Sequence, residues 1–153
     1  MSITVKEESF ESLETYRKNS NLRLNWSSVF VLPGFMRSWW QVFALDGARL
    51  FIRSVWQDDK LLGIAPMQVN GTTASFIGHK DVFDYIDFMT VPGTEKDFFS
   101  ILLDDFRANG ITTLDLGPVR PDATVLTSLV DIAKAQHLSV DTAKEDVFIE
   151  LTR

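Results

Sequence analysis

The sequence has no cysteine, and histidine occurs only twice in its 153 residues. Without cysteine the protein cannot form a disulfide, a thiolate nucleophile, an iron–sulfur cluster or a thiolate zinc site. A hydrolase triad needs a histidine as its base, so His79 and His137 are the only candidates for that role. The chemistry open to this chain therefore rests on oxygen groups and these two histidines.

Basic residues are also too few and too scattered to form a nucleic-acid surface. The chain carries 15 basic and 21 acidic side chains, which gives a net charge of −6, whereas phosphate-backbone binding relies on clustered lysine and arginine. No run reaches the roughly 18 apolar residues of a membrane-spanning helix, and the polar, acidic start does not resemble a secretory signal. We expect a cytoplasmic protein with no nucleic-acid partner and no membrane insertion.

Large apolar side chains are abundant by contrast. Hydrophobic residues make up 45% of the chain, which includes 12 phenylalanines and 4 tryptophans. This is enough apolar surface to offset the entropy cost of ordering the backbone. Since a domain usually has roughly 100 to 200 residues, the length predicts a single domain over residues 1–153.

Hydrophobic spacing and turn residues predict the order of the secondary-structure elements. We expect helices at 8–19, from Pro33, from Thr94 to Gly110 with Thr94 as its cap, and at 122–136 with Asp122 as its cap. We expect strands at 49–56, 61–69, 72–77, 83–89, 111–116, 138–142 and 147–151. Asn70-Gly71 is a strong hairpin signal because both residues tolerate positive φ. This order predicts an α/β fold with a mixed, largely antiparallel sheet flanked by helices.

The most distinctive local feature is the segment 81–88, which places three carboxylates and a phenol among large apolar residues. On a helix Asp81, Asp84 and Asp87 would share one face and could bind a hard cation. We favour a strand, whose period of two separates Asp84 from Asp87, and so predict no metal site. Two interpretations of Asp84, Tyr85 and Asp87 stay open, because sheet-end aspartates accept backbone hydrogen bonds but can also face a substrate.

The adjacent pair Trp39-Trp40 has two interpretations. Stacking on a ligand is one, but the neighbouring Phe35, Met36 and Phe43 form a wide apolar stripe that favours a helix facing the core.

Three further features concern single residues. His79 lies in a predicted loop, where it is either a candidate for chemistry or a solvated surface histidine. His137 ends a predicted helix, where an imidazole complements the helix dipole. Pro66 cannot donate to a sheet ladder, so it should mark an edge or a bulge.

Five pieces of sequence occur in an order typical of one known family. They are an aromatic residue, a helix with two adjacent tryptophans, a hairpin strand containing GIAP, a strand ending in FIG and a DYID segment, at Phe30, 35–43, 61–67, 76–78 and 84–87. Over residues 22–151 the chain resembles the N-terminal part of the CelD/BcsL family of GNAT-like acyltransferases. That family is linked to cellulose and exopolysaccharide biosynthesis and is related to the twin-lobed FemAB transferases.

The resemblance implies a GNAT-type fold and transfer of an acyl group from acyl-CoA, such as acetyl-CoA, to an amine or a hydroxyl. It implies an acceptor groove formed by Asp84, Tyr85 and Asp87, with Trp39 and Trp40 packing under it; His79 lies on the loop just before this segment. GNAT enzymes hold the CoA pyrophosphate at a helix N-terminus, on a loop resembling Q/R-x-x-G-x-G/A. This sequence has no such loop, so we expect the chain alone to be inactive.

Two functions from different classes follow. In the first, the chain is the N-terminal lobe of an acyltransferase and completes an acceptor groove beside a second GNAT-like lobe. In the second, it is a non-catalytic binding or assembly domain that forms a homodimer or pairs with another protein. A third interpretation, a FemAB-like enzyme using aminoacyl-tRNA, is disfavoured because the chain is acidic.

Overall fold

The computed structural model describes residues 2–26, 28–78, 86–143 and 147–152. One mixed sheet with the order β1-β2-β3-β4-β6-β8-β7 forms its centre. The strands are β1 (Ile3–Glu7), β2 (Arg49–Gln57), β3 (Lys60–Asn70), β4 (Thr73–Phe76), β5 (Met89–Thr90), β6 (Thr113–Leu116), β7 (Ser139–Thr142) and β8 (Val147–Glu150). The pairs are antiparallel except for β4 and β6, which are parallel. The predicted mixed, largely antiparallel sheet is confirmed.

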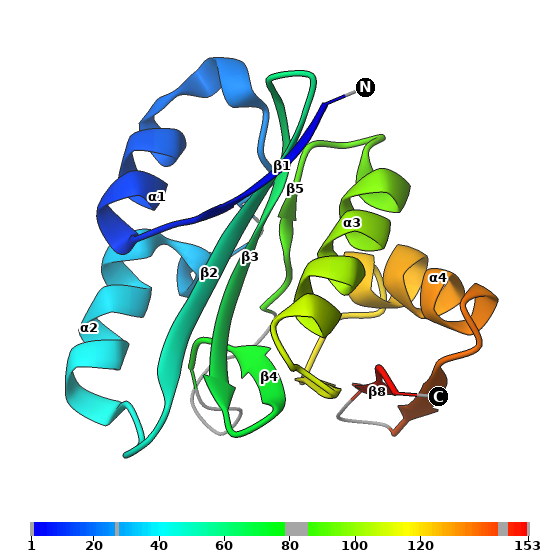
Figure 1. The fold of residues 1–153 in the computed structure, drawn as a ribbon. Helices are drawn as coiled ribbons and strands as arrows, with labels where there is room; N and C mark the ends of the chain where they lie inside the picture. Colours follow the sequence, from blue (N-terminus) through cyan, green and yellow to red (C-terminus); the bar gives the residue numbers. More distant parts are fainter. Residues whose placement is uncertain (1, 27, 79–85, 144–146, 153) are drawn as a thin grey trace.

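Helices cover both faces of this sheet. Figure 1 shows α1 and α2 on one side and α3 and α4 on the other. The helices are α1 (Phe10–Lys18), α2 (Pro33–Phe43), α3 (Glu95–Ala108) and α4 (Val130–Ala135), with the short turns η1 (Ser20–Leu22), η2 (Val29–Val31) and the π-helical η3 (Val125–Leu129). Among the residues that the structure describes, no helix has both the length and the apolar character needed to cross a bilayer.

The two predicted hairpins form where their turn residues indicate. Asp58 and Asp59 connect β2 to β3 with φ of 50° and 63°, the left-handed conformation of a tight two-residue loop. At the other end of β3, Asn70 pairs with Thr73 across Gly71, whose φ is 63°. Short-range turn chemistry therefore sets the register of the three central strands.

Strand β1 was not predicted. Its residues pair with β2 from Ile3↔Gln57 to Glu7↔Arg53, yet only Val5 among them is even half-buried. The segment lacks the apolar alternation that marks a strand in sequence, because it is an exposed edge held by its backbone pairing with β2.

Pro66 lies at the point along β3 where the neighbouring strand changes from β4 to β5. Residues Met67–Asn70 of β3 pair with β4, whereas Gly63 and Ile64 pair with β5. The N–H of Ile77 donates to the carbonyl of Pro66 at 3.0 Å, and Pro66 has no N–H with which to continue the ladder. The sequence predicts an edge or a bulge here. β3 is not an edge strand, because Pro66 pairs with β2, but Pro66 does lie where the partner on the other side of β3 changes from β4 to β5.

A cluster of aromatic rings fills the core under α3. The ring of Phe88 lies 5.0 Å from that of Phe76, 5.9 Å from that of Phe98 and 5.1 Å from that of Phe99. All four side chains are buried, so the cluster fixes β4 and the approach to β5 against α3.

The backbone of β3 approaches this cluster most closely at Gly63. A Cβ there would lie 2.9 Å from the carbonyl oxygen of Met89 and 2.9 Å from the ring of Phe98. We expect Gly63→Ala to lower the free energy of unfolding by about 1–2 kcal/mol, because overpacking forces backbone and ring to shift. Urea denaturation measures this loss. The control is Gly34→Ala, where a Cβ meets nothing within 4 Å; equal stability of the two variants would contradict the prediction.

Candidate functional site

The sheet splits between β5 and β6. β4 and β6 pair in parallel, Thr73–Ser75 with Thr113–Asp115. β5 pairs with a different stretch of β3 from the one that pairs with β4, and among the described strands it pairs with β3 alone. Ligands of α/β proteins commonly bind beyond the carboxyl ends of parallel strands, where neighbouring strands diverge. The split is therefore the place in this fold to look for a site.

Asp87 bridges the split. It precedes β5, and its carboxylate accepts two hydrogen bonds from Thr124 at the start of η3: 2.8 Å from the backbone N–H and 2.6 Å from the hydroxyl. The residue is 6% exposed. Burial raises the pKa of Asp87, and the bonds from Thr124 counteract this only in part. A carboxylate thus joins the two sides of the split and caps the helical segment that follows β6.

This arrangement corrects the predicted cap of the last helix. The Asp122 carboxylate, expected to cap it, pairs instead with the Arg120 guanidinium at 3.2 Å. The helical segment begins at Thr124, whose N–H is bound by a residue 37 positions away in sequence. Local sequence contains no signal for such a cap.

Carboxylates of the chain itself also surround the start of α3. The side chain of Glu95 accepts the N–H of Gly93 at 2.9 Å, and Glu95 and Asp97 both lie in the first turn. Thr94 stands at the cap position, but its hydroxyl donates to the carbonyls of Val91 and Leu62 rather than capping the helix. The two acidic residues complement the helix dipole and leave negative charge where an anion would bind.

The other predicted site residues lie in different places. His79, Asp81, Asp84 and Tyr85 fall outside the described residues. In the rest of the chain that the structure describes, no group of three acidic or histidine side chains could hold a metal ion.

The tryptophan pair lies on α2. Trp39 is 8% exposed and belongs to the core, with its ring 6.3 Å from that of Phe43, and Trp40 is half-buried against the same core. This favours the interpretation of the pair as a core-facing stripe. Asp87 and the two tryptophans therefore come from different elements.

His137 directly follows the C-cap of α4. Its φ is 61°, and its N–H donates to the carbonyl of Lys134 at 3.0 Å. The residue thus occupies the left-handed position that ends many helices, as expected of a histidine at a helix end.

A partly buried polar network, missed in the sequence, connects Glu8, between β1 and α1, with residues of α1 and β2. Glu8 accepts hydrogen bonds from the hydroxyls of Tyr16 at 2.8 Å and Ser54 at 2.6 Å, and Ser54 accepts from the indole N–H of Trp56 at 2.8 Å. Burial, with the neighbouring Glu8 carboxylate, raises the pKa of Tyr16 to about 12. Because every donor has an acceptor, the network fixes α1 against the sheet.

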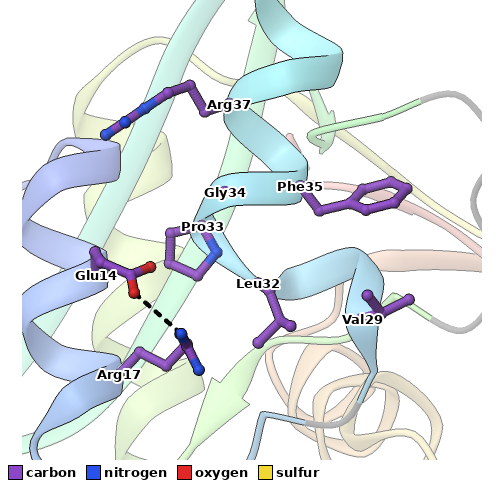
Figure 2. Close-up of a pocket in the computed structure, with 8 residues that line it drawn as sticks. All are labelled: Glu14, Arg17, Val29, Leu32, Pro33, Gly34, Phe35 and Arg37. Atoms are coloured by element: carbon purple, nitrogen blue, oxygen red, sulfur yellow. Dashed lines mark hydrogen bonds and ion pairs between the residues drawn. The ribbon is translucent and has the colours of Figure 1, made fainter.

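A pocket of about 520 Å³ lies beside α1 at the start of α2 (Figure 2). Its lining residues are Glu14, Arg17, Val29, Leu32, Pro33, Gly34, Phe35 and Arg37. Arg17 pairs with Glu14 at 3.1 Å, and Arg37 pairs with Glu11 at 2.9 Å. The lining of the pocket combines apolar side chains with two arginines, each of which pairs with a glutamate. It was not predicted, because its residues come from two helices and the turn between them.

Comparison with known proteins identifies the fold. The sequence matches no protein-family model, and no curated protein matches it. The structure matches the ribosomal-protein-S18-alanine N-acetyltransferase of Escherichia coli with a TM-score of 0.57 and 14% identity, over 99% of this chain and 96% of that one. The fold is that of the GNAT acetyltransferases. The GNAT-like fold expected from the sequence is confirmed.

Two further GNAT structures bear on how such a fold is used. The PaiA N-acetyltransferase of Thermoplasma acidophilum, in complex with coenzyme A, matches with a TM-score of 0.50 and 16% identity over 98% of both chains. A tandem GNAT protein from the clavulanic acid biosynthesis pathway matches with a TM-score of 0.50 and 14% identity, over 92% of this chain and 45% of that one. At these identities the likeness shows the fold.

The GNAT fold implies acyl-CoA, whose pyrophosphate needs free backbone N–H groups at a helix start. The first turn of α3 carries two carboxylates, Glu95 and Asp97. Because they place negative charge where the pyrophosphate would lie, the residues present at this helix start fit the pyrophosphate of CoA poorly.

Proposed function

We propose that this chain is the N-terminal, acceptor-side lobe of a GNAT-type acyltransferase. The observation that carries the proposal is a GNAT fold along the chain in which two carboxylates, Glu95 and Asp97, lie in the first turn of α3, where an anion would bind. Such a lobe can supply an acceptor surface while a second GNAT-like lobe holds the acyl-CoA. The tandem GNAT protein, of which this chain spans 45%, is a precedent for two such units in one polypeptide.

The acceptor in this proposal is an amine or a hydroxyl of a polysaccharide or cell-envelope precursor, as in the CelD/BcsL family. The series of residues that resembles that family supports it. In the structure the paired tryptophans lie on α2, residues 61–67 lie in β3, residues 76–78 end β4, and Asp87 precedes β5. Three of these four pieces thus lie in β3, at the end of β4 or directly before β5, near the strands that diverge at the split.

Asp87 is the described residue best suited to act on an acceptor there. An attacking amine or hydroxyl must lose a proton, and a carboxylate with a raised pKa is a better base than an ordinary one. Burial raises the pKa of Asp87. In the proposed site Asp87 would receive this proton directly or through a water. Asp84, Tyr85 and His79, the other polar residues of the predicted groove, lie outside the described residues.

Thiol release from acetyl-CoA tests the proposal. The full-length product of the gene should transfer acyl groups to an amine- or hydroxyl-bearing saccharide, and this chain alone should release thiol no faster than buffer. The difference is expected because the acyl donor is held by the second lobe. Turnover by the chain alone, or none by the full-length product with any saccharide tested, would contradict the proposal.

The second candidate function, assembly as a homodimer, is favoured by apolar side chains at the end of α2. Val42, Phe43 and Leu45 are 72%, 61% and 65% exposed, more than large apolar residues usually are where no partner covers them. Light scattering measures the oligomeric state of the chain. Dimerisation, together with a full-length product that shows no acyl transfer, would support the assembly function. A chain that stays monomeric up to about 100 µM, far above the Kd of a stable dimer, counts against it.

A further inference from the structure

We propose that the pocket between α1 and the start of α2 is a binding site for a small molecule that joins one carboxylate to an apolar body such as a ring. The site is separate from the proposed acyl transfer and does not rest on it. Its volume, about 520 Å³, lies within the range of pockets that hold small ligands. The pocket belongs to the side of the sheet that carries α1 and α2, whereas α3 and α4 cover the other side (Figure 1).

The apolar part of the pocket is formed by side chains that remain exposed. Val29 is 51% exposed and Phe35 is 39% exposed, and Leu32 and Pro33 lie between these two and α1 (Figure 2). The ring of Phe35 is supported by that of Phe30, whose centroid is 5.3 Å away at an interplanar angle of 88°. An apolar body in the pocket would therefore remove exposed apolar surface from water without rearranging the core.

The polar part of the pocket carries a surplus of positive charge. Its lining contains two arginines, Arg17 and Arg37, against one glutamate, Glu14. The first turn of α2 has no acidic residue, and no side chain caps its start, so the positive end of the helix dipole adds to this charge. In a chain of net charge −6, this surplus favours an anion in the pocket.

Glu11 balances the surplus from outside the lining and can be exchanged for a ligand. Its carboxylate accepts a hydrogen bond from Arg37 Nη2 at 2.9 Å, and its side chain is 76% exposed. Such an exposed ion pair contributes little to stability, because water solvates both partners well. The guanidinium of Arg37 has five N–H donors in a planar fork that suits a carboxylate. A ligand carboxylate can therefore bind Arg37 while Glu11 turns to water.

The same balance of charge favours a carboxylate over a phosphate. A ligand carboxylate replaces the single negative charge of Glu11 and leaves the total unchanged. A phosphate dianion would add a second negative charge near Glu14, which already pairs with Arg17 at 3.1 Å. The ligand class that fits is a monoanion with an aromatic or branched apolar group.

The probe that tests this site is 3-phenylpropionate, which combines a carboxylate with a ring. Titrated into the ¹⁵N-labelled chain, it should shift the NMR signals of backbone amides within residues 29–37 and saturate with a Kd of about 1 mM or lower. The neutral 3-phenylpropanamide should bind about tenfold more weakly, because it lacks the charge. Phenyl phosphate should bind no more tightly than the acid.

Two variants and a matched control locate the charge that the ligand uses. Arg37→Gln should weaken the binding of 3-phenylpropionate by about tenfold. Glu11→Gln should strengthen it by about two- to fivefold, because it removes the competitor for Arg37. The control is Arg49→Gln, which removes the same charge from an exposed residue outside the pocket lining and should leave the Kd unchanged. A gain in affinity cannot come from misfolding, and thermal melts establish that each variant is folded.

The proposal is overturned if 3-phenylpropionate does not saturate the chain up to about 10 mM, or if its shifts lie away from the pocket lining. It is also overturned if the acid and the amide bind equally, if Arg37→Gln and Arg49→Gln have the same Kd, or if Glu11→Gln brings no gain. Tighter binding of phenyl phosphate would contradict the choice of a carboxylate. None of these results bears on the proposed function, whose test measures acyl transfer by the full-length product.

Discussion

Replacing Phe88 with alanine should lower the free energy of unfolding by about 3–5 kcal/mol. The side chain is 1% exposed, and its ring contacts those of Phe76, Phe98 and Phe99 at centroid distances of 5.0–5.9 Å. Truncation would remove these contacts and leave a cavity that β4, β5 and α3 border together and that cannot collapse without moving a strand. Urea or guanidinium denaturation followed by tryptophan fluorescence measures the loss.

Two controls separate packing from a general effect of losing a phenylalanine. Phe88→Leu keeps most of the volume and should cost less than about 1.5 kcal/mol. Phe43→Ala removes a side chain that is 61% exposed and should change stability by no more than about 0.5 kcal/mol. The cluster does not hold β5 in place if Phe88→Ala and Phe43→Ala unfold at the same denaturant concentration.

The helices and strands whose ends are marked by turn residues or prolines in the sequence were predictable. Pro33 begins α2, Asn70-Gly71 turns β3 into β4, and the tight loop at Asp58 and Asp59 joins the long strands. In each case the sequence signal lies within a few neighbouring residues. The signal is a proline with a fixed φ, a turn residue that tolerates a positive φ, or a regular spacing of apolar residues. The order of these elements predicted the mixed, largely antiparallel sheet flanked by helices, and the resemblance to the CelD/BcsL family implied the GNAT fold.

The contacts that define the candidate site were not predictable in the same way. The bond from Thr124 to Asp87 and the bond from Ser54 to Glu8 join residues 37 and 46 positions apart. A single sequence identifies Asp87 as unusual but cannot identify its donor, because pairing between distant polar groups depends on the register of the sheet. The same limit explains β1, whose polar residues are held in a strand only by β2.

Replacing Asp87 with alanine should lower the free energy of unfolding by about 2–4 kcal/mol. The change removes the acceptor for two donors of Thr124, the backbone N–H and the hydroxyl. It therefore combines the loss of a helix cap with a donor left without an acceptor near the core. Asp87→Asn should cost far less, since its amide oxygen can accept the N–H while its NH₂ donates to the hydroxyl oxygen. Denaturation at pH 7 measures both, and equal losses would contradict the prediction.

The pH dependence of Asp87→Asn provides a second, signed measurement. Burial raises the pKa of Asp87, so between the unfolded value of about 3.9 and the raised folded value the folded state binds the proton more tightly. Wild-type stability should therefore fall, relative to that of the uncharged Asn variant, as pH rises through this window. Above the folded pKa the difference should be constant. The prediction is contradicted if the difference in free energy of unfolding between the two proteins is constant from pH 3 to 7, or if it changes in favour of the wild type as pH rises. Either result would show that burial does not destabilise the carboxylate.

The same variant decides whether the bridge at the split is also a site. If Asp87 takes a proton from the acceptor, Asp87→Asn should reduce acyl transfer by the full-length product by about 100-fold while the variant stays folded. If Asp87 only caps η3, transfer should follow stability, so Asp87→Ala should lose activity on warming and Asp87→Asn should keep it. The two roles are compatible, because a carboxylate with its oxygens fixed by Thr124 retains lone pairs and has the raised pKa that a base requires. Unchanged transfer by Asp87→Asn would leave Asp87 with the structural role alone.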